Sequence, residues 1–159
     1  IDEGHKILVF SQFTSVLSNI SKVFKENEVS HYYLDGSTPI KTRNKIVEDF
    51  NKDDTSVFLI SLKAGGTGLN LTSADIVIHF DPWWNPAVED QATDRAHRIG
   101  QKHVVEVIKM ISEGTIEEKI ISLQEEKKNL IDKVVGKDIE LGENISNLDD
   151  EDILALFKR

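Results

Sequence analysis

The run VFLISLKAGGTGLNLTSADIVIHF, residues 57–80, decides the fold of this chain. It holds two short apolar segments, VFLI at 57–60 and IVIHF at 76–80, on either side of a glycine-containing stretch. Continuous runs of Val, Ile, Leu and Phe of this length are typical of strands buried on both faces. Three similar runs lie further out, ILVF at 7–10, YYL at 32–34 and VVEVIKMI at 104–111. Helical stretches separate the runs, and this alternation predicts a three-layer α/β sandwich with a mainly parallel sheet.

Explicit start signals mark two of the helices between these strands. Thr38 before Pro39 predicts an N-cap with proline at the first helical position. The apolar stripe of that helix would consist of Ile40, Val47 and Phe50.

Asn85 before Pro86 repeats the same signal. The helix that begins there is predicted to end at Arg98 at the latest, because Gly100 suits the left-handed residue that follows a helix.

A long helix is predicted after the last strand. Thr115 and Glu118 form a capping-box pattern, and apolar residues continue at helical spacing to Gly136. The predicted organisation is therefore a main domain at 1–113, a long helix at 114–136, and an acidic linker with a short helix at 137–159.

Composition limits the classes of function. The formal net charge is −9, and residues 110–159 hold 7 Lys and Arg against 13 Asp and Glu. Residues 1–109 hold 12 against 15, so the tail carries most of the acidity and a nucleic-acid partner is disfavoured without being excluded. The chain has no cysteine, no signal-peptide pattern and no apolar run of the roughly 20 residues that a membrane helix needs, which favours an intracellular protein. Its first residue is Ile1, so we expect an excised fragment.

Glycines cluster after the strand at 57–60. Gly65, Gly66 and Gly68 would let a loop bring backbone amides close to phosphate oxygens. A tight strand-to-helix turn without a ligand explains the glycines equally well. The segment lacks the GxxxxGK[ST] pattern of a Walker A loop and the GxGxxG pattern of a dinucleotide site.

Two further patterns follow at 79–101. Trp83 and Trp84 are adjacent between two prolines, so we expect at least one of them at a surface. Arg95 and Arg98 are three residues apart on the predicted helix, with Gln91 one turn earlier. Two guanidinium groups on one face can stabilise a phosphate during its transfer. Spacing alone favours ordinary surface ion pairs with Asp90 or Asp94.

Five motifs, taken in their order along the chain, resemble the C-terminal motor lobe of SWI/SNF-type helicase-like ATPases of superfamily two. They are KILVFSQF at 6–13, YYLDGST at 32–38, AGGTGLNL at 64–71, FDPWWNP at 80–86 and QATDRAHRIGQ at 91–101. The resemblance covers roughly residues 4–135 and extends to GTIEEKIISLQ at 114–124, which is similar to the brace-like helix of the family. It implies a RecA-like lobe of an ATP-driven motor that moves along double-stranded DNA and acts on protein–DNA complexes.

The resemblance also implies roles for individual residues. Arg95 and Arg98, with Gln91, match the catalytic residues that reach the γ-phosphate of ATP, and Gly68 and Asn70 match ATP-side positions. The positions that match DNA backbone contacts are Gly36, Ser37, Lys63, Gly65, Gly66 and Thr67. We add Trp84 to the DNA contacts and expect Trp83 in the core.

Half of an ATPase site is missing from these motifs. The Walker A lysine and the acidic metal-binding motif of such motors belong to a first RecA-like lobe, which would bind most of the ATP and Mg²⁺, and we expect the chain alone to be inactive. Its partners would then be double-stranded DNA, the first lobe, and a DNA-bound protein, with no metal site of its own and no membrane contact. The resemblance implies nuclear localisation in a eukaryote and the cytoplasmic nucleoid in a bacterium. The alternative is a non-catalytic DNA- or protein-docking domain derived from a motor lobe.

Overall fold

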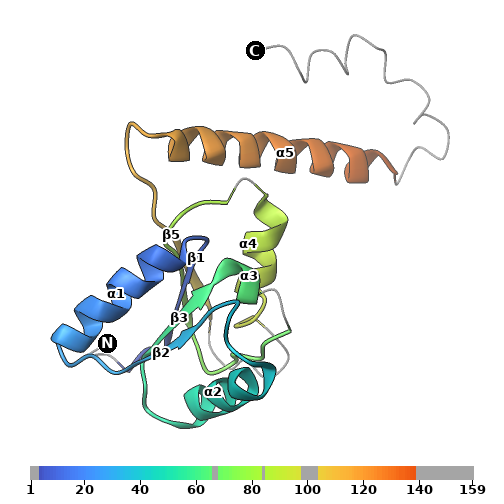
Figure 1. The fold of residues 1–159 in the computed structure, drawn as a ribbon. Helices are drawn as coiled ribbons and strands as arrows, with labels where there is room; N and C mark the ends of the chain where they lie inside the picture. Colours follow the sequence, from blue (N-terminus) through green and yellow to red (C-terminus); the bar gives the residue numbers. More distant parts are fainter. Residues whose placement is uncertain (1–3, 66–67, 84, 98–103, 139–159) are drawn as a thin grey trace. The chain divides into compact units, whose positions relative to one another are not determined.

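The computed structural model describes residues 4–65, 68–83, 85–97 and 104–138 (Figure 1). The strands in this part are β1 (Ile7–Ser11), β2 (His31–Leu34), β3 (Val57–Ser61), β4 (Ile76–His79) and β5 (Glu106–Lys109). The helices are α1 (Thr14–Glu26), α2 (Ile40–Lys52), α3 (Leu62–Gly65), α4 (Pro86–Thr93) and α5 (Ile116–Asp138). Strands and helices alternate, which confirms the predicted α/β class. None of the described helices is long and apolar enough to cross a membrane.

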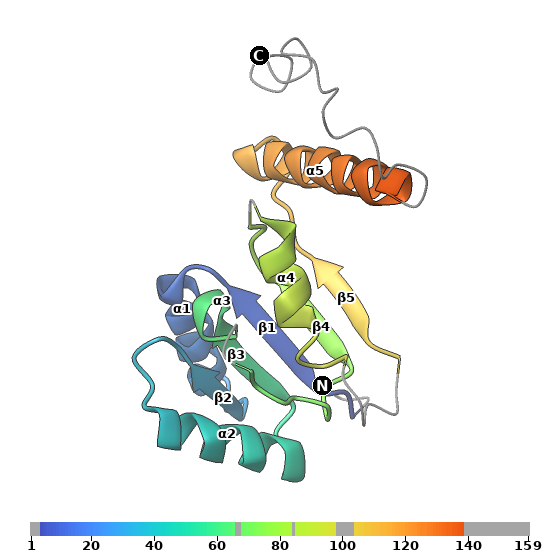
Figure 2. The ribbon, with the colours of Figure 1, turned by 90° about the vertical axis from the view of Figure 1, so that its right-hand side faces the viewer.

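The strands form one sheet in the order β2-β3-β1-β4-β5, and all four pairings are parallel. Phe10 of β1 is in register with Ile60 of β3 on one side and His79 of β4 on the other. Helix α1 covers one face of the sheet, whereas α2 and α4 cover the opposite face (Figure 2). These three layers confirm the predicted sandwich.

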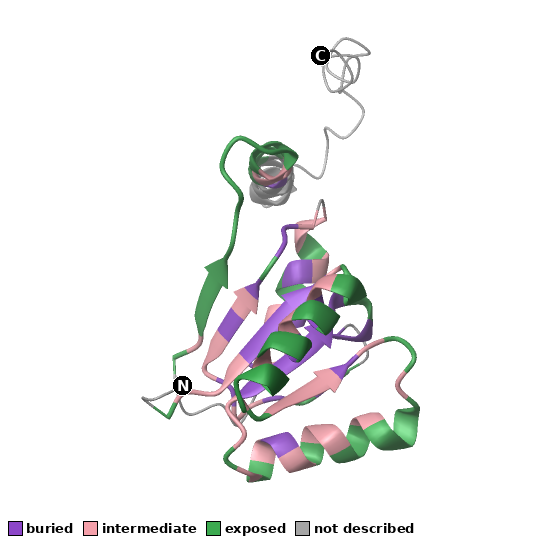
Figure 3. Ribbon diagram, turned by 60° about the vertical axis from the view of Figure 1, so that its left-hand side comes forward, coloured by how far each residue is buried: buried purple, intermediate pink, exposed green. Residues whose placement is uncertain are grey.

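Side chains of the two central strands alternate between the two faces, as the pleat of a strand requires. Leu8, Phe10, Phe58 and Ile60 join the larger core cluster beneath α2 and α4, and Val9, Val57 and Leu59 join Leu17 beneath α1. Each fully buried side chain of this size stabilises the fold by about 1.5–3 kcal/mol. Figure 3 shows the buried colour concentrated on these strands.

Strand β5 does not have the predicted burial. All four of its residues are exposed, and Val107 and Ile108 expose 43% and 39% of their surface. It lies at one end of the strand order, where it pairs with β4 alone, and none of its residues joins either core cluster of the described part. Burial on both faces was therefore predicted correctly for β1 and β3 and wrongly for β5.

The start of α2 differs from the prediction by one residue. Pro39 is the N-cap, since its carbonyl accepts the first helical hydrogen bond from Arg43 N–H at 2.9 Å. Thr38 instead braces the preceding turn, where its Oγ1 accepts from Asp35 N–H at 3.2 Å. Ile40 is 76% exposed, so the apolar stripe is carried by later residues of the helix, with Phe50 fully buried.

Helix α4 begins at Asn85 and Pro86 as predicted, but its last residue is Thr93. The next residues form tight turns, in which Arg95 N–H donates to Ala92 O at 3.1 Å and Ala96 N–H to Thr93 O at 3.0 Å. The predicted C-terminal Gly100 lies outside the described residues.

The predicted long helix is confirmed as α5, of 23 residues. Thr115 Oγ1 accepts from Glu117 N–H at 3.2 Å, and the carboxylate that reaches back is that of Glu117, to Ser112 N–H at 2.7 Å. Glu118 had been expected in that role. The chain divides into two compact units, Ile1–Gln124 and Glu125–Arg159, so the first unit includes the first part of α5. Residues 139–159 lie outside the described part.

Candidate functional site

The carboxyl ends of parallel strands meet at one edge of a sheet, and ligands of open α/β sheets bind there. At this edge the residues that follow β1, β3 and β4 line a hollow of about 340 Å³. Its lining consists of Gln12, Leu62, Lys63, Trp83 and Val88. Lys63 is exposed, and Trp83, which had been expected in the core, is half-buried and packs against the larger core cluster. Trp84 lies outside the described residues.

Asp81 fixes the loops that surround this hollow. Its carboxylate is 7% exposed and accepts from the hydroxyl of Ser11 and, at 2.9 Å, from Gln12 N–H. The Gln12 side chain then donates to Pro82 O at 3.4 Å. The segment that follows β1 is thereby joined to the tryptophan loop, by which we mean residues 80–83.

The turn after β2 is also held by a carboxylate. Asp35 Oδ1 accepts from Ser37 N–H at 2.9 Å and from the Ser37 hydroxyl at 2.6 Å. This hydroxyl bond is the main reason that the pKa of Asp35 lies below its ordinary value. Arg43 donates to Gly36 O at 3.0 Å and to Thr38 O at 2.7 Å. Gly36 and Ser37, the predicted DNA contacts, are thus exposed on a turn that is already ordered.

The glycines after β3 differ in burial: Gly65 is packed in the core, whereas Gly68 is exposed. Gly65 ends α3 and is buried, and a Cβ atom there would lie 2.8 Å from Cε1 of Phe10. Gly68 is exposed with φ of 71°, a backbone conformation that favours glycine. Gly66 and Thr67 lie outside the described residues. Gly65 therefore has a packing role that its sequence motif did not reveal.

A second group of predicted site residues lies at the far end of α4. Arg95 is half-buried, its Nε donates to Gln91 O at 2.9 Å, and its carbonyl accepts from Leu71 N–H at 2.9 Å. Asn70 O accepts from the Asn51 side chain at 2.7 Å. The segment with Gly68 and Asn70 also lines a hollow of about 350 Å³ beside α2. The structure therefore brings Gln91 and Arg95 together with the segment at 69–71.

The two arginines cannot share a face of α4 as expected, because the helix ends at Thr93, before either arginine. Arg98 lies outside the described residues. Helix α4 has 8 residues and so measures about 12 Å. It runs back from the carboxyl edge (Figure 2), so Trp83, which precedes its first residue, and Arg95, which follows its last residue, lie at opposite ends of it.

A buried carboxylate on α4, paired with a partly exposed lysine, was missed in the sequence. Glu89 is 1% exposed, and its Oε1 accepts from Trp83 N–H at 2.6 Å and from the Gln124 side chain at 3.0 Å. Lys109 Nζ of β5 lies 2.6 Å from Glu89 Oε2 and donates to Gln124 Oε1 at 3.3 Å. The Gln124 amide also donates to Trp83 O. The available signal was a lysine at a position of the VVEVIKMI run that faces α4.

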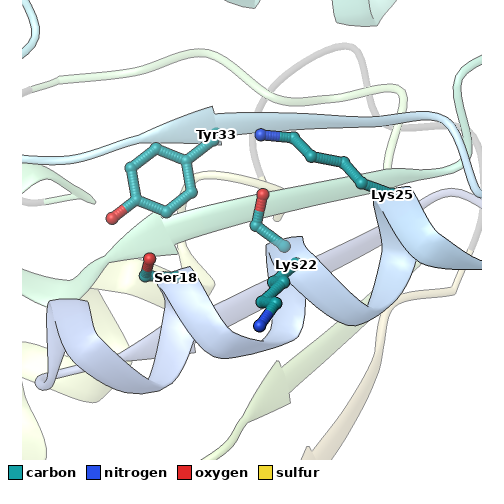
Figure 4. Close-up of a pocket in the computed structure, with 5 residues that line it drawn as sticks. Ser18, Lys22, Lys25 and Tyr33 are labelled. Atoms are coloured by element: carbon teal, nitrogen blue, oxygen red, sulfur yellow. The ribbon is translucent and has the colours of Figure 1, made fainter.

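A further hollow lies on the other face of the sheet, between α1 and β2 (Figure 4). It is lined by Ser18, Ser21, Lys22, Lys25 and Tyr33. Lys22 makes an ion pair with Glu26 at 3.9 Å, and the Tyr33 hydroxyl donates to Asp35 at 3.3 Å. This hollow contains none of the predicted site residues.

A family and several known proteins match this chain. Residues 1–100 match the model of the helicase conserved C-terminal domain. The chain is 46% identical over 159 residues to an uncharacterised ATP-dependent helicase of Mycoplasma pneumoniae, covering 99% of this chain and 15% of that protein. It is 46% identical over 134 residues to the DNA repair protein RAD5 of Candida glabrata, covering 80% and 12%.

A further relative and a solved structure extend the comparison. The chain is 43% identical over 135 residues to the human chromatin-remodeling ATPase INO80, covering 84% of this chain and 9% of that protein. A crystal structure of the C-terminal part of the Fun30 ATPase domain superposes with a TM-score of 0.74 at 41% identity, covering 77% of this chain and 40% of that one. The chain thus spans 15% or less of the three curated relatives.

Proposed function

Because the chain belongs to the helicase conserved C-terminal domain family, among its SWI/SNF-type members, we propose that it is the second motor lobe of a DNA-dependent ATPase. The complete enzyme would move along double-stranded DNA and remodel protein–DNA complexes. This lobe contributes arginine side chains to ATP hydrolysis and part of the track that holds the DNA backbone. Without the first lobe it hydrolyses no ATP.

One observation supports this proposal: the residues that follow strands at the carboxyl edge and the residues that follow α4 form two separate groups, beside two different hollows. Lys63, Gly36 and Ser37 follow strands at the carboxyl edge, where exposed backbone and an ammonium group suit the phosphates of a DNA strand. Gln91 and Arg95 lie at the other end of α4, next to the segment at 69–71. An ATP-driven motor needs both surfaces on the same lobe, one that contacts DNA and one that contacts ATP.

The residues around Arg95 suit one half of a nucleotide site. A guanidinium group donates hydrogen bonds and accepts none, so it matches phosphate oxygens and repels a cation. We therefore assign Mg²⁺ and most of the ATP contacts to the first lobe, and only Arg95, Arg98, Gln91, Gly68 and Asn70 to this one. ATP would supply the phosphoryl group whose transfer to water drives the movement.

In the hydrolysis step, the arginines act on charge that develops on the γ-phosphate. The bond from Arg95 Nε to Gln91 O fixes the plane of the guanidinium before ATP arrives, so little reorganisation is needed during the reaction. Closure of the two lobes would bring this group against the phosphate. The track residues Lys63, Gly65, Gly66, Thr67 and Trp84 would move with the lobe, which converts hydrolysis into a step along DNA.

The arginine assignment is tested in the full-length protein with Arg95→Ala and Arg98→Ala. We expect ATP affinity to stay nearly unchanged and duplex-stimulated turnover to fall about a thousandfold or more. The control is Lys25→Ala on α1, a cation on the other side of the sheet, which should keep wild-type turnover. Near-normal turnover of both arginine variants would overturn the assignment.

The chain alone provides a second test. We expect no ATP hydrolysis and weak duplex binding that falls steeply with salt, and Lys63→Ala should lower the slope of log K against log salt by about one. Robust hydrolysis by the chain alone would contradict the proposal. A full-length protein that binds DNA without duplex-stimulated hydrolysis would instead favour the docking-domain alternative.

A further inference from the structure

The buried carboxylate of Glu89 has a position that packing alone does not explain. A carboxylate with 1% exposure costs several kcal/mol to desolvate unless it is paired and hydrogen-bonded. Glu89 recovers part of this cost from groups in three separate segments: hydrogen bonds from the backbone of Trp83 and the amide of Gln124, and an ion pair with the ammonium of Lys109. One side chain thus joins the tryptophan loop, β5 and the first part of α5 to α4.

The C-terminal end of α4 is also held by contacts with other segments. His79 Nε2 and Thr93 Oγ1, at the end of β4 and the last residue of α4, are 3.0 Å apart. The His79 ring stacks on Phe10 with ring centroids 5.7 Å apart. Two residues beyond Thr93, the carbonyl of Arg95 is bonded to Leu71 N–H. Helix α4 is therefore held by contacts at both ends. Its first part is bonded to the tryptophan loop, and its last residue is followed closely by the proposed catalytic arginine, Arg95.

We propose that Glu89 is a positioning residue, which makes the conformation of the tryptophan loop set the orientation of α4 and hence of Gln91 and Arg95. The link that matters is the bond from Trp83 N–H to Glu89 Oε1, because it joins the loop directly to the helix. Lys109 neutralises the carboxylate, and Gln124 extends the link to α5. This inference rests on the proposed function, since it concerns how DNA at the loop stimulates ATP hydrolysis.

The test uses two double variants of the full-length protein that differ in one acceptor. Glu89→Gln with Lys109→Met removes both charges and keeps an amide oxygen for Trp83 N–H. Glu89→Leu with Lys109→Met removes the same charges but leaves both Trp83 N–H and the Gln124 amide without that acceptor. Replacing both partners of a buried ion pair by well-packed uncharged residues is often neutral for stability, so both variants are expected to fold. A thermal melt of each verifies this.

The measurement is the ratio of ATP turnover with saturating duplex to turnover without it, since this ratio does not depend on the fraction of folded protein. We expect the glutamine variant to keep the wild-type ratio within about threefold. The leucine variant should lose about 10- to 100-fold, because a misplacement of about 1 Å in a catalytic group can cost about a hundredfold in rate. The control is Glu26→Gln, an exposed acid paired with Lys22 on α1, which should behave as wild type.

Equal ratios in the two double variants would overturn the inference, whether both are high or both are low, because the Trp83 acceptor would then have no separate effect. A merely structural Glu89 would lower the melting temperature of the leucine variant and leave its ratio unchanged. Failure of the proposed function is a different result, since wild-type protein itself would show no stimulation by duplex DNA.

Discussion

Replacing Gly65 by alanine tests whether this glycine of the AGGTG motif is needed for packing. Gly65 is the last residue of α3 and is buried, and its neighbour Phe10 is fully buried in the larger core cluster. A Cβ atom at Gly65 would lie 2.8 Å from Phe10 Cε1, 3.4 Å from Phe10 Cδ1 and 3.8 Å from Ile60 Cγ2. Ordinary carbon–carbon contacts are about 3.5–4.0 Å, so the first of these distances requires a shift.

The expected cost follows from how little the ring can move. His79 stacks against Phe10, and the strands on both sides of β1 hold its backbone. Overpacking at such a site costs about 1–3 kcal/mol. The lower conformational entropy of alanine in the unfolded chain offsets about 0.4–1 kcal/mol of this. We expect Gly65→Ala to lower the free energy of unfolding by about 1–2 kcal/mol, or the melting temperature by roughly 2–8 °C.

Urea denaturation of the 159-residue chain measures this difference. The matched control is Gly36→Ala, where a Cβ atom would meet nothing within 4 Å, and its stability should change by less than about 0.5 kcal/mol. Adding Phe10→Leu to Gly65→Ala should cost less than the sum of the single changes, since the smaller side chain leaves room for the new methyl group. A neutral Gly65→Ala, or strict additivity with Phe10→Leu, would refute the packing explanation.

Two other predictions concern hydrogen-bonded and titrating groups. The Tyr32 hydroxyl donates to Asp53 Oδ2 at 2.5 Å, and this bond helps to raise the pKa of Tyr32 to about 12. Tyr32→Phe should therefore lower the free energy of unfolding, measured with denaturant, by about 1 kcal/mol. No change would show that solvent replaces the bond. Burial holds the pKa of His79 below its ordinary value of 6.5, so the unfolded chain binds a proton first as pH falls. Stability should therefore decrease on acidification from about pH 7.5 to about pH 5.5. His79→Gln should reduce that decrease, and an unchanged pH slope would show that His79 does not cause it.

Local sequence patterns were sufficient to predict the elements of the fold. The apolar runs at 7–10, 57–60 and 76–80 became strands because continuous Val, Ile, Leu and Phe suit a sheet with both faces covered. Proline at 86 marked the start of α4 for a similarly local reason, its fixed φ angle. Such effects depend on neighbours in the chain, so the sequence expresses them directly.

The order of the strands in the sheet could not be predicted from local sequence patterns. The run at 104–111 has the composition of a buried strand, yet β5 is exposed, because none of its residues joins the core clusters that the helices form with the other strands. The end of α4 at Thr93 was also missed. It coincides with the contact between Arg95 and Leu71, which are 24 positions apart in the chain, and no helix-ending residue marks it. Both errors concern contacts between distant segments.

By itself, then, the sequence determined the alternation of strands and helices and, through five motifs in order, the family of the chain. Only the tertiary structure decided how those motifs are grouped. It placed Trp83 and Arg95 at opposite ends of α4, and it buried Glu89 between the tryptophan loop and Lys109. The physical reason is that a motif is defined by neighbouring residues, whereas a site is defined by donors, acceptors and charges that the sheet and its helices bring together from distant positions.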